Sequence, residues 1–335
     1  MNTLVSILIP TYKRASFLRE AIASALAQTY HDVEVLVLDD ASPDETPSVV
    51  AEFAGDTRLR SIRHPVNLGI AENWRAGIEA KQGDFFCILH DDDTFEPEFV
   101  QTLIQPLLGD PDAILTCSDH WMMDSAGNRL ASVSDECSRR FRRDGMRNGK
   151  LPDFARSALV DASPPIGATL FRSSMIRPEF IHEKAKGSID AWLFYECVRT
   201  GRSAYYCSQR LMNYRIHAGG MSSSMPLYMT EGHIFRYRRI LADPERASLH
   251  VEIVGKLAEA LTVYSVNLLV QGRCGEARQS AREALTLRFS RRAQVIHLLT
   301  YAGEVGTRTA QMIKWGSRVC STVLSAFNKP THQEI

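Results

Sequence analysis

Three consecutive carboxylates, Asp91-Asp92-Asp93, follow the apolar run at 85–89. Like charges a few ångströms apart repel one another, so such a run either protonates one member or binds a cation. Magnesium and manganese ions prefer oxygen ligands and are commonly shared between one or two carboxylates and the phosphates of a substrate. The run therefore predicts a divalent cation site. The alternative is a solvated acidic turn that precedes the helix expected from Glu96.

Three further polar clusters follow apolar segments nearer the N-terminus. They are Pro10-Thr11-Tyr12, Asp39-Asp40, and Arg63 with Asn67-Leu68-Gly69. Ligands of open α/β sheets bind beyond the carboxyl ends of the strands, where such clusters would meet along one edge. Asp and Asn are also ordinary turn residues, so one cluster alone carries little weight. Four clusters in the same relation to four strands predict a single site.

The elements that must position these clusters alternate between strand and helix. Apolar segments predict strands at 4–9, 33–38, 59–63, 84–89 and 113–118. Helical periodicity predicts helices at 15–28, 46–53, 70–81, 96–108 and 189–200. This alternation is typical of βαβ units and a parallel sheet. The nearly continuous apolar strands favour a sheet that is covered on both faces.

The regularity fades after residue 120. Residues 124–150 are polar and rich in Arg, Ser, Asp and Gly, which predicts a surface loop or lid. Short strands are expected at 205–207 and 211–216, and the chain is mostly helical from about residue 227. Residues 268–284 predict one helix-turn-helix similar to a tetratricopeptide pair, and one copy does not make a repeat array.

Composition and missing motifs exclude several classes of protein. Lys and Arg together number 39, as do Asp and Glu, so the basic excess of a nucleic-acid-binding protein is missing. The seven cysteines have no CxxC spacing, which favours reduced thiols in a cytoplasmic protein. We expect no transmembrane helix, because no apolar run is long enough. Neither a Gly-x-Gly-x-x-Gly nor a Walker loop follows the first strand, which argues against the usual dinucleotide and P-loop sites.

Five segments, taken together and in order, resemble a family 2 glycosyltransferase with a GT-A fold. They are Val5–Tyr12, Val37–Asp44, Asn67–Asn73, Leu89–Asp93 and Tyr214–His217. The resemblance implies a Rossmann-like, mostly parallel sheet flanked by helices over residues 1–222. Within it, the nucleotide half would span 1–120 and the acceptor half 121–222. Residues 223–335 would form a helical C-terminal appendage, which the resemblance does not cover.

The resemblance also implies roles for the matching residues. Asp39 would accept a hydrogen bond from a uracil- or thymine-like base. The rest of the nucleotide would be lined by Pro10, Thr11, Tyr12, Asp40, Arg63, Asn67, Asp91 and Asp92. Mn²⁺ or Mg²⁺ would be held by Asp91, Asp93 and His217, with Asp93 as the direct ligand.

Two residues near the metal carry open alternatives. Arg215 would give a fixed cation to phosphate oxygens, or else form a surface salt bridge. His90 stands where many relatives carry an acidic residue. We expect its side chain to be packed or solvated. The alternative is that it binds the metal or contacts a residue that binds the metal.

The catalytic base is expected outside the nucleotide half. Asp190 lies in the first turn of the helix predicted at 189–200, where the helix dipole favours the ionised carboxylate. An ionised carboxylate suits a group that deprotonates an acceptor hydroxyl. An ordinary helix-start Asp is the alternative. Gly167 is expected close to the donor sugar.

The resemblance implies a metal-dependent, inverting glycosyltransferase of polysaccharide or glycoconjugate synthesis. A nucleotide sugar, with UDP- or TDP-sugars favoured, would donate to a saccharide or lipid-linked saccharide. We expect a cytoplasmic protein, at the inner face of the membrane if the helix predicted at Met312–Phe327 lies on lipid rather than docking on protein. The basic run Arg139–Arg143 is either solvated or touches an anionic acceptor. Rivals are a non-catalytic nucleotide-sugar-binding or scaffold protein and a metal-dependent phosphotransferase.

Overall fold

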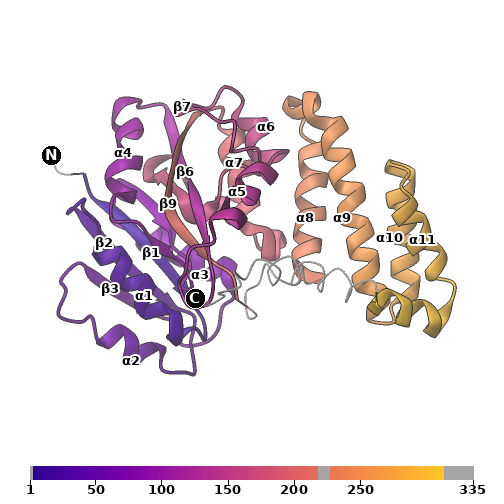
Figure 1. The fold of residues 1–335 in the computed structure, drawn as a ribbon, viewed down its shortest axis with the longest axis horizontal. Helices are drawn as coiled ribbons and strands as arrows, with labels where there is room; N and C mark the ends of the chain where they lie inside the picture. The colour runs from indigo at the N-terminus through magenta and orange to yellow at the C-terminus, as the bar shows by residue number, and fades with distance from the viewer. Residues whose placement is uncertain (1–2, 218–226, 313–335) are drawn as a thin grey trace, which may run out of the picture. The chain divides into compact units, whose positions relative to one another are not determined.

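The computed structural model describes residues 3–217 and 227–312. The chain divides into two compact units, residues 1–219 and 220–335. The first unit is a sheet covered by helices and the second is helical throughout its described part (Figure 1). Each unit is described by itself.

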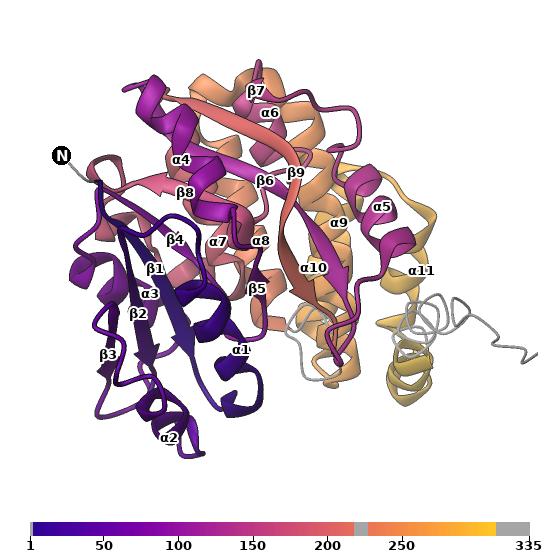
Figure 2. The same ribbon diagram turned by 60° about the vertical axis from the view of Figure 1, so that its left-hand side comes forward.

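The described part of the first unit is built on one mixed sheet of nine strands (Figure 2). Their order across the sheet is β3-β2-β1-β4-β8-β6-β9-β5, and β7 pairs with β9. The strands are β1 (Val5–Thr11), β2 (Val33–Asp39), β3 (Leu59–Arg63), β4 (Phe85–Ile88), β5 (Thr94–Phe95), β6 (Ala113–Met123), β7 (Gly149–Lys150), β8 (Thr169–Arg172) and β9 (Ser203–Arg215). Strands β1 to β4 are mutually parallel. Strand β8 runs antiparallel to both β4 and β6.

Alternate residues of the central strands face opposite helical layers. On one face, α1 (Ala15–Leu26) and α4 (Phe99–Gly109) bury their apolar stripes against the odd-numbered residues of β1 and β2. On the other face lies α3 (Ile70–Ala80), so close that a Cβ on Gly77 would lie 2.4 Å from Leu38 Cδ1. The same face carries α7 (Ile189–Arg199), which reaches the sheet through Phe194 and Phe171. Burial on both sides explains why these strands are apolar almost without interruption.

Strand register places the predicted polar ends side by side. Thr11 pairs with Asp39, and Asp39 pairs with Arg63. Beyond β4, the Leu89 amide still bonds to Leu8, so the Asp91–Asp93 run begins just past the same edge. The predicted meeting of the strand ends is therefore observed.

Two elements differ from the sequence-based expectation. Helix α5 (Ala131–Arg140) lies within 124–150, where a loop or lid was predicted. Its buried side chains are Ser134 and Ser138. Because this buried face is polar, the sequence has no apolar periodicity that would predict the helix. Strand β9 is one continuous element where two short strands were predicted, because it pairs with the length of β6 through several irregularities. The remaining short helices are α2 (Thr46–Ala51) and α6 (Phe154–Leu159).

The second unit consists of helices packed in hairpins in its described part. They are α8 (Leu227–Leu241), α9 (His250–Val270), α10 (Cys274–Leu287) and α11 (Arg291–Leu299). The turn between α9 and α10 contains Gly272 with φ +76°, a left-handed conformation that suits glycine. Across this hairpin the Ser265 hydroxyl donates to the Ala277 carbonyl. The predicted helix-turn-helix is therefore present, with wider bounds than expected.

Helical length and apolarity raise the question of a membrane span. One helical stretch of the described residues, Pro244–Val270, is long and apolar enough to cross a bilayer by composition alone. However, 61% of its most apolar window is buried inside the structure, as in a core helix. The helix predicted at 312–327 lies outside the described residues beyond Met312. Cys87, Cys117 and Cys197 are free and buried, in accord with the predicted reduced thiols.

Candidate active site

Asp39 presents an unused acceptor at the edge of the sheet. Its Oδ1 accepts the Ser42 amide at 2.8 Å. Its Oδ2 is buried and accepts no hydrogen bond from the described residues, although Arg63 Nε lies 3.5 Å away. A buried carboxylate oxygen without a hydrogen bond is costly, so this atom is suited to accept one from a ligand. Tyr12, two residues beyond Pro10, is 40% exposed at the same edge.

Asp40 serves the local backbone instead. Its two carboxylate oxygens accept the amides of Leu68 at 2.6 Å and Gly69 at 2.9 Å. The Asn67 side chain donates to the Asp40 carbonyl at 3.2 Å. Both residues thus fix the turn that leads into α3, and the carboxylate of Asp40 has little capacity left for a nucleotide.

Asp92 and His217 come together from positions 125 residues apart. Asp92 Oδ2 lies 3.0 Å from His217 Nε2. Arg14 Nη1, from the loop before α1, lies 2.9 Å from each of these two atoms. The His217 ring also packs against Phe17, with ring centroids 4.9 Å apart. An oxygen, an imidazole nitrogen and a cation therefore converge at one point.

Asp93 lies just behind that point. Its Oδ1 accepts the Arg215 amide at 2.9 Å, and its Oδ2 lies 3.3 Å from His90 Nδ1. Its side chain is 1% exposed. The Arg215 guanidinium is equally buried, where it binds Glu20, the Asp92 carbonyl and the Ser125 carbonyl. Arg215 therefore holds the Asp91–Asp93 run in place through its amide and its guanidinium. Because that guanidinium is buried in these contacts, it is not available as the phosphate-binding cation expected from the sequence.

The crowded carboxylates alter protonation in the cluster. Burial, and then the charge of Asp92, raise the pKa of Asp91 to about 7, against the opposing charges of Arg14 and His90. Burial tends to lower the pKa of His90, but the hydrogen bond and charge of Asp93, with the charges of Asp92 and Asp190, raise it to about 9. Asp93 and Asp92 thus favour the cationic form of His90, whose side chain is 30% exposed and packs near Trp74.

The donor set fits an open divalent-metal site. No three His, Cys, Asp or Glu side chains within residues 3–217 and 227–312 are grouped as a metal cage. The pair Asp92 and His217 supplies one oxygen and one nitrogen, and Arg14 already brings positive charge to both. A carboxylate with an imidazole suits Mn²⁺ better than Mg²⁺, with phosphates and water to complete the shell. By this geometry Asp92, rather than Asp93 or Asp91, is the carboxylate that meets His217.

Asp190 approaches the cluster from the opposite face of the sheet. It occupies the first turn of α7, close enough for its charge to raise the pKa of His90. The backbone of Gly167 lies beside His90 and Asp93, where a Cβ would sit 3.7 Å from His90 Nδ1 and 3.8 Å from Asp93 Oδ2. The same Cβ would lie 2.7 Å from Met212 Cε, so a side chain at this position would displace Met212.

Two residues of the site were not assigned to it from the sequence. One is Arg14, because nothing in the sequence ties it to residues 92 and 217. Trp74 on α3 reads as a core residue, yet its indole nitrogen is buried without a hydrogen-bond partner among the described residues. Its ring centroid lies 6.2 Å from that of His90. No sequence signal distinguishes such a donor from an ordinary packed Trp.

Known proteins show the same motifs and fold. A model of glycosyl transferase family 2 matches residues 6–160. An uncharacterized glycosyltransferase of Rickettsia prowazekii is 30% identical over 219 residues, covering 65% of this chain and 65% of the relative. The chain thus matches just under two thirds of that relative's length.

Solved structures extend the likeness in fold to nearly the whole chain. S. aureus TarS 1-349, in complex with UDP-GlcNAc, has a TM-score of 0.63 at 16% identity, covering 91% of this chain and 88% of that one. The mannosyltransferase PcManGT of Pyrobaculum calidifontis, in complex with GDP-Man and Mn²⁺, has a TM-score of 0.56 at 16% identity, covering 98% and 88%. The fold is therefore that of GT-A glycosyltransferases, with a helical C-terminal region. Residues 6–160 of this chain are therefore similar to glycosyl transferase family 2.

Proposed function

We propose that the protein is an inverting glycosyltransferase that moves a sugar from a nucleoside diphosphate to an acceptor hydroxyl. The observation that carries this proposal is the meeting of Asp92, His217 and Arg14 at the strand edge, with Asp190 facing the same cluster. A leaving diphosphate needs positive charge on one side of the sugar, and the attacking acceptor hydroxyl needs a base on the other. The solved neighbours bound to UDP-GlcNAc and to GDP-Man support a nucleotide-sugar donor.

We place the base of the nucleotide beside Asp39, at the sheet edge where the parallel strands end. The free Asp39 Oδ2 would accept the imide N–H of a uracil or thymine ring. Thr11 and Arg63, its neighbours in register, would flank the base and ribose. A guanine ring also presents N–H donors, so the choice of nucleotide is a matter for measurement.

The diphosphate is assigned to Asp92, His217 and Arg14. A bound Mn²⁺ would neutralise the charge that develops on the leaving diphosphate. Asp92 and His217 would hold that ion, and His90 would balance the charge of Asp93 behind it. Arg14 is placed to exchange its contacts with Asp92 and His217 for a phosphate oxygen, the role expected of Arg215 from the sequence.

The transfer is a single displacement. Asp190 takes the proton of the acceptor hydroxyl, whose oxygen forms a bond to the anomeric carbon. The bond from that carbon to the diphosphate oxygen breaks as its electron pair leaves with the nucleoside diphosphate. Because attack and departure occur on opposite faces, the anomeric configuration inverts and no covalent enzyme intermediate forms.

Calorimetric titration tests the proposal directly. UDP, GDP and TDP would each be titrated into the protein with Mn²⁺ and with EDTA. We expect one nucleotide to bind tightly in a metal-dependent manner, and Asp92→Asn to lose that binding. Asp56→Asn, a carboxylate paired with Arg58 away from the site, is the matched control. Absence of binding for all three nucleotides would refute the proposal in favour of a non-catalytic scaffold.

A further inference from the structure

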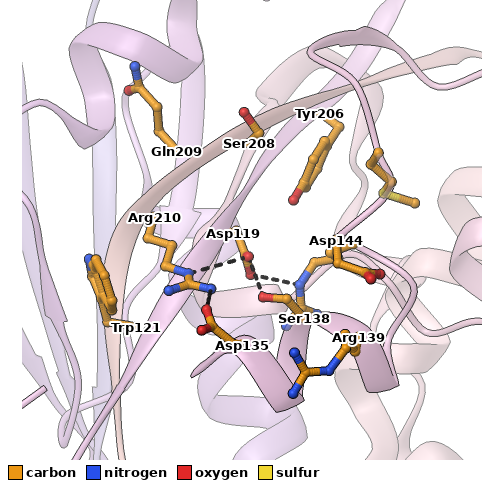
Figure 3. Close-up of a pocket in the computed structure, with 12 residues that line it drawn as sticks. Asp119, Trp121, Asp135, Ser138, Arg139, Asp144, Tyr206, Ser208, Gln209 and Arg210 are labelled. Carbon is orange, nitrogen blue, oxygen red and sulfur yellow. Dashed lines mark hydrogen bonds and ion pairs between the residues drawn. The ribbon is translucent and has the colours of Figure 1, made fainter. Parts of the chain in front are cut away.

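A second polar cavity lies in the first unit, apart from the Asp92–His217 pair. It has a volume of about 590 Å³, is open to solvent, and is lined by β6, α5, the loop after α5, and β9 (Figure 3). Small-molecule sites occupy roughly 300–1,000 Å³. Neither the sequence motifs nor the proposed transfer assigns any role to this space.

The floor of the cavity is preformed. Asp119 is 5% exposed, and its Oδ1 accepts Arg143 Nε at 2.8 Å. Its Oδ2 accepts the Ser138 hydroxyl at 2.5 Å and lies 3.6 Å from Arg210 Nε. A buried pair of this kind holds α5 and both strands in place without help from a ligand. The space above it therefore exists before anything binds.

The walls include an aromatic ring and a hydroxyl. The Trp121 ring packs against two guanidinium groups, with the Arg210 carbon 4.5 Å and the Arg129 carbon 5.3 Å from its centroid. Tyr206 is 3% exposed, and its hydroxyl points into the cavity. That hydroxyl makes no hydrogen bond within the described residues and is open to the cavity, so it can bond to a ligand there.

The charges that line the cavity cancel. Three carboxylates and three guanidinium groups face it, from Asp119, Asp135, Asp144, Arg139, Arg143 and Arg210. A site for phosphate or for a polyanion would show a surplus of positive charge. Alternating donors and acceptors instead match an uncharged, polyhydroxylated molecule, whose hydroxyls bond to groups of both signs.

The cavity is connected to the proposed reaction site by two segments. Arg143 Nη1 donates to the Ser163 carbonyl, four residues before Gly167 at the Asp run. On β9, Arg210 lies five residues before Arg215, whose amide binds Asp93. Five strand residues span about 17 Å. The cavity is therefore too far away for the reacting hydroxyl, but within the length of a short oligosaccharide.

We propose that this cavity binds neutral sugar units of the acceptor that are remote from the hydroxyl being glycosylated. That this glycan is an acceptor rests on the proposed transferase function. Binding of a neutral glycan at Trp121 and Tyr206 can be tested whether or not the protein is a transferase. The charge balance assigns a neutral glycan rather than the anionic one suggested by the basic run 139–143.

The test is a glycan array probed with the full chain, followed by calorimetry on the strongest ligand. The array would carry neutral hexose and N-acetylhexosamine oligosaccharides beside uronate- and sulfate-bearing ones. Tyr206→Phe removes one hydroxyl and keeps the ring, so we expect about 3- to 10-fold weaker binding. Trp121→Ala should weaken it at least as much. The matched control is Tyr205→Phe, whose hydroxyl donates to Asp110 at 3.0 Å and does not line the cavity.

The outcomes separate this inference from the proposed function. Binding of neutral glycans that both cavity variants weaken, with nucleotide affinity unchanged in Tyr206→Phe, supports it. No glycan binding, binding of anionic glycans only, or equal affinities in all three variants overturns it. If neutral glycans bind at the cavity while no nucleotide binds, the transferase proposal fails and the glycan site stands.

Discussion

At the scale of single residues, the carboxylates of the Asp run have different tasks. Asp92 faces His217 and Arg14, whereas Asp93 is buried between His90 and the Arg215 amide. Asp91 is held near its titration midpoint at neutral pH, because its pKa is raised to about 7 by burial and by Asp92. Three identical side chains in a row are thus differentiated by what each one touches.

Substitution of Asp92 and of Asp93 separates these tasks. We expect Asp92→Asn to weaken Mn²⁺-dependent nucleotide binding by about 100-fold or more, because it removes a charged metal ligand. Asp93→Asn should mainly lower stability, since it unbalances the cationic His90. Calorimetry with Mn²⁺ and thermal unfolding of both variants check this assignment. The reverse pattern would restore Asp93 as the direct ligand.

Removal of the Arg14 side chain is predicted to change the affinities for metal and for nucleotide in opposite directions. In the absence of nucleotide its guanidinium competes with a metal ion for Asp92 and His217. We therefore expect Arg14→Ala to bind Mn²⁺ more tightly without nucleotide, and to bind the nucleoside diphosphate more weakly. Electron paramagnetic resonance of free Mn²⁺ measures the first effect, and calorimetry the second. The control is Arg19→Ala, which breaks an exposed pair with Glu52.

Asp190 is predicted to affect the rate and not the donor. The Asp190→Asn side chain keeps its size but cannot take a proton. We expect kcat to fall by about 10²–10⁴-fold with nucleotide affinity unchanged. Steady-state transfer assays alongside calorimetry test both statements. An equal loss in nucleotide affinity would instead indicate that Asp190 supports the donor pocket.

At the scale of elements, short polar segments hold the site together. The Asp40 carboxylate orders the turn at 67–69, and Gly69 adopts φ +83° at the start of α3. Arg143 and Asp119 tie α5 to the sheet through a buried ion pair. These segments carry no apolar pattern, and their backbone groups are satisfied by charged side chains.

Loss of the Asp40 carboxylate should cost stability. Asp40→Ala removes two hydrogen bonds from backbone amides to a buried anion, so we expect a decrease of about 2–4 kcal/mol in the free energy of unfolding. Asp40→Asn retains one acceptor oxygen and should lose about half as much. Urea denaturation of the three proteins measures the series. Equal stabilities would mean that water replaces the carboxylate at this turn.

At the scale of the whole molecule, each unit contains a histidine that resists protonation, the buried His120 in the first and the half-buried His233 in the second. Burial, with the charge of Arg143, lowers the pKa of His120 to about 4 despite the opposing charge of Asp119. Burial, with the charges of Arg236 and Lys256, lowers the pKa of His233 to about 3. Both histidines have an ordinary pKa near 6.5 in the unfolded chain.

These shifts predict an acid-sensitive fold. Between the folded and unfolded pKa values the unfolded chain binds more protons, so stability is present above about pH 6.5 and is lost as the pH falls toward 4. Each histidine should account for about 1 kcal/mol between pH 7.5 and 5.5. Urea denaturation at both pH values, with His120→Gln and His233→Gln, isolates each contribution. A pH response that the variants leave unchanged would contradict this origin.

The sequence determined the repeating features of this protein. Apolar strands flanked by amphipathic helices predicted the order of elements from β1 to α4, because local periodicity records which faces are buried. Polar residues at the strand ends predicted one shared edge, and register brings Thr11, Asp39 and Arg63 together there. The order of the motifs along the chain was enough to detect the resemblance to family 2 glycosyltransferases, which the match over residues 6–160 supports.

Only the tertiary structure decided which polar groups meet. His217 could have faced any member of the Asp run, and the irregular pairing of β9 with β6 is what directs it to Asp92. The buried Arg215, the polar helix α5 and the cavity beside it likewise depend on contacts between segments far apart in sequence. Charged and polar side chains have no local period, so their partners are set by the packing of the whole unit.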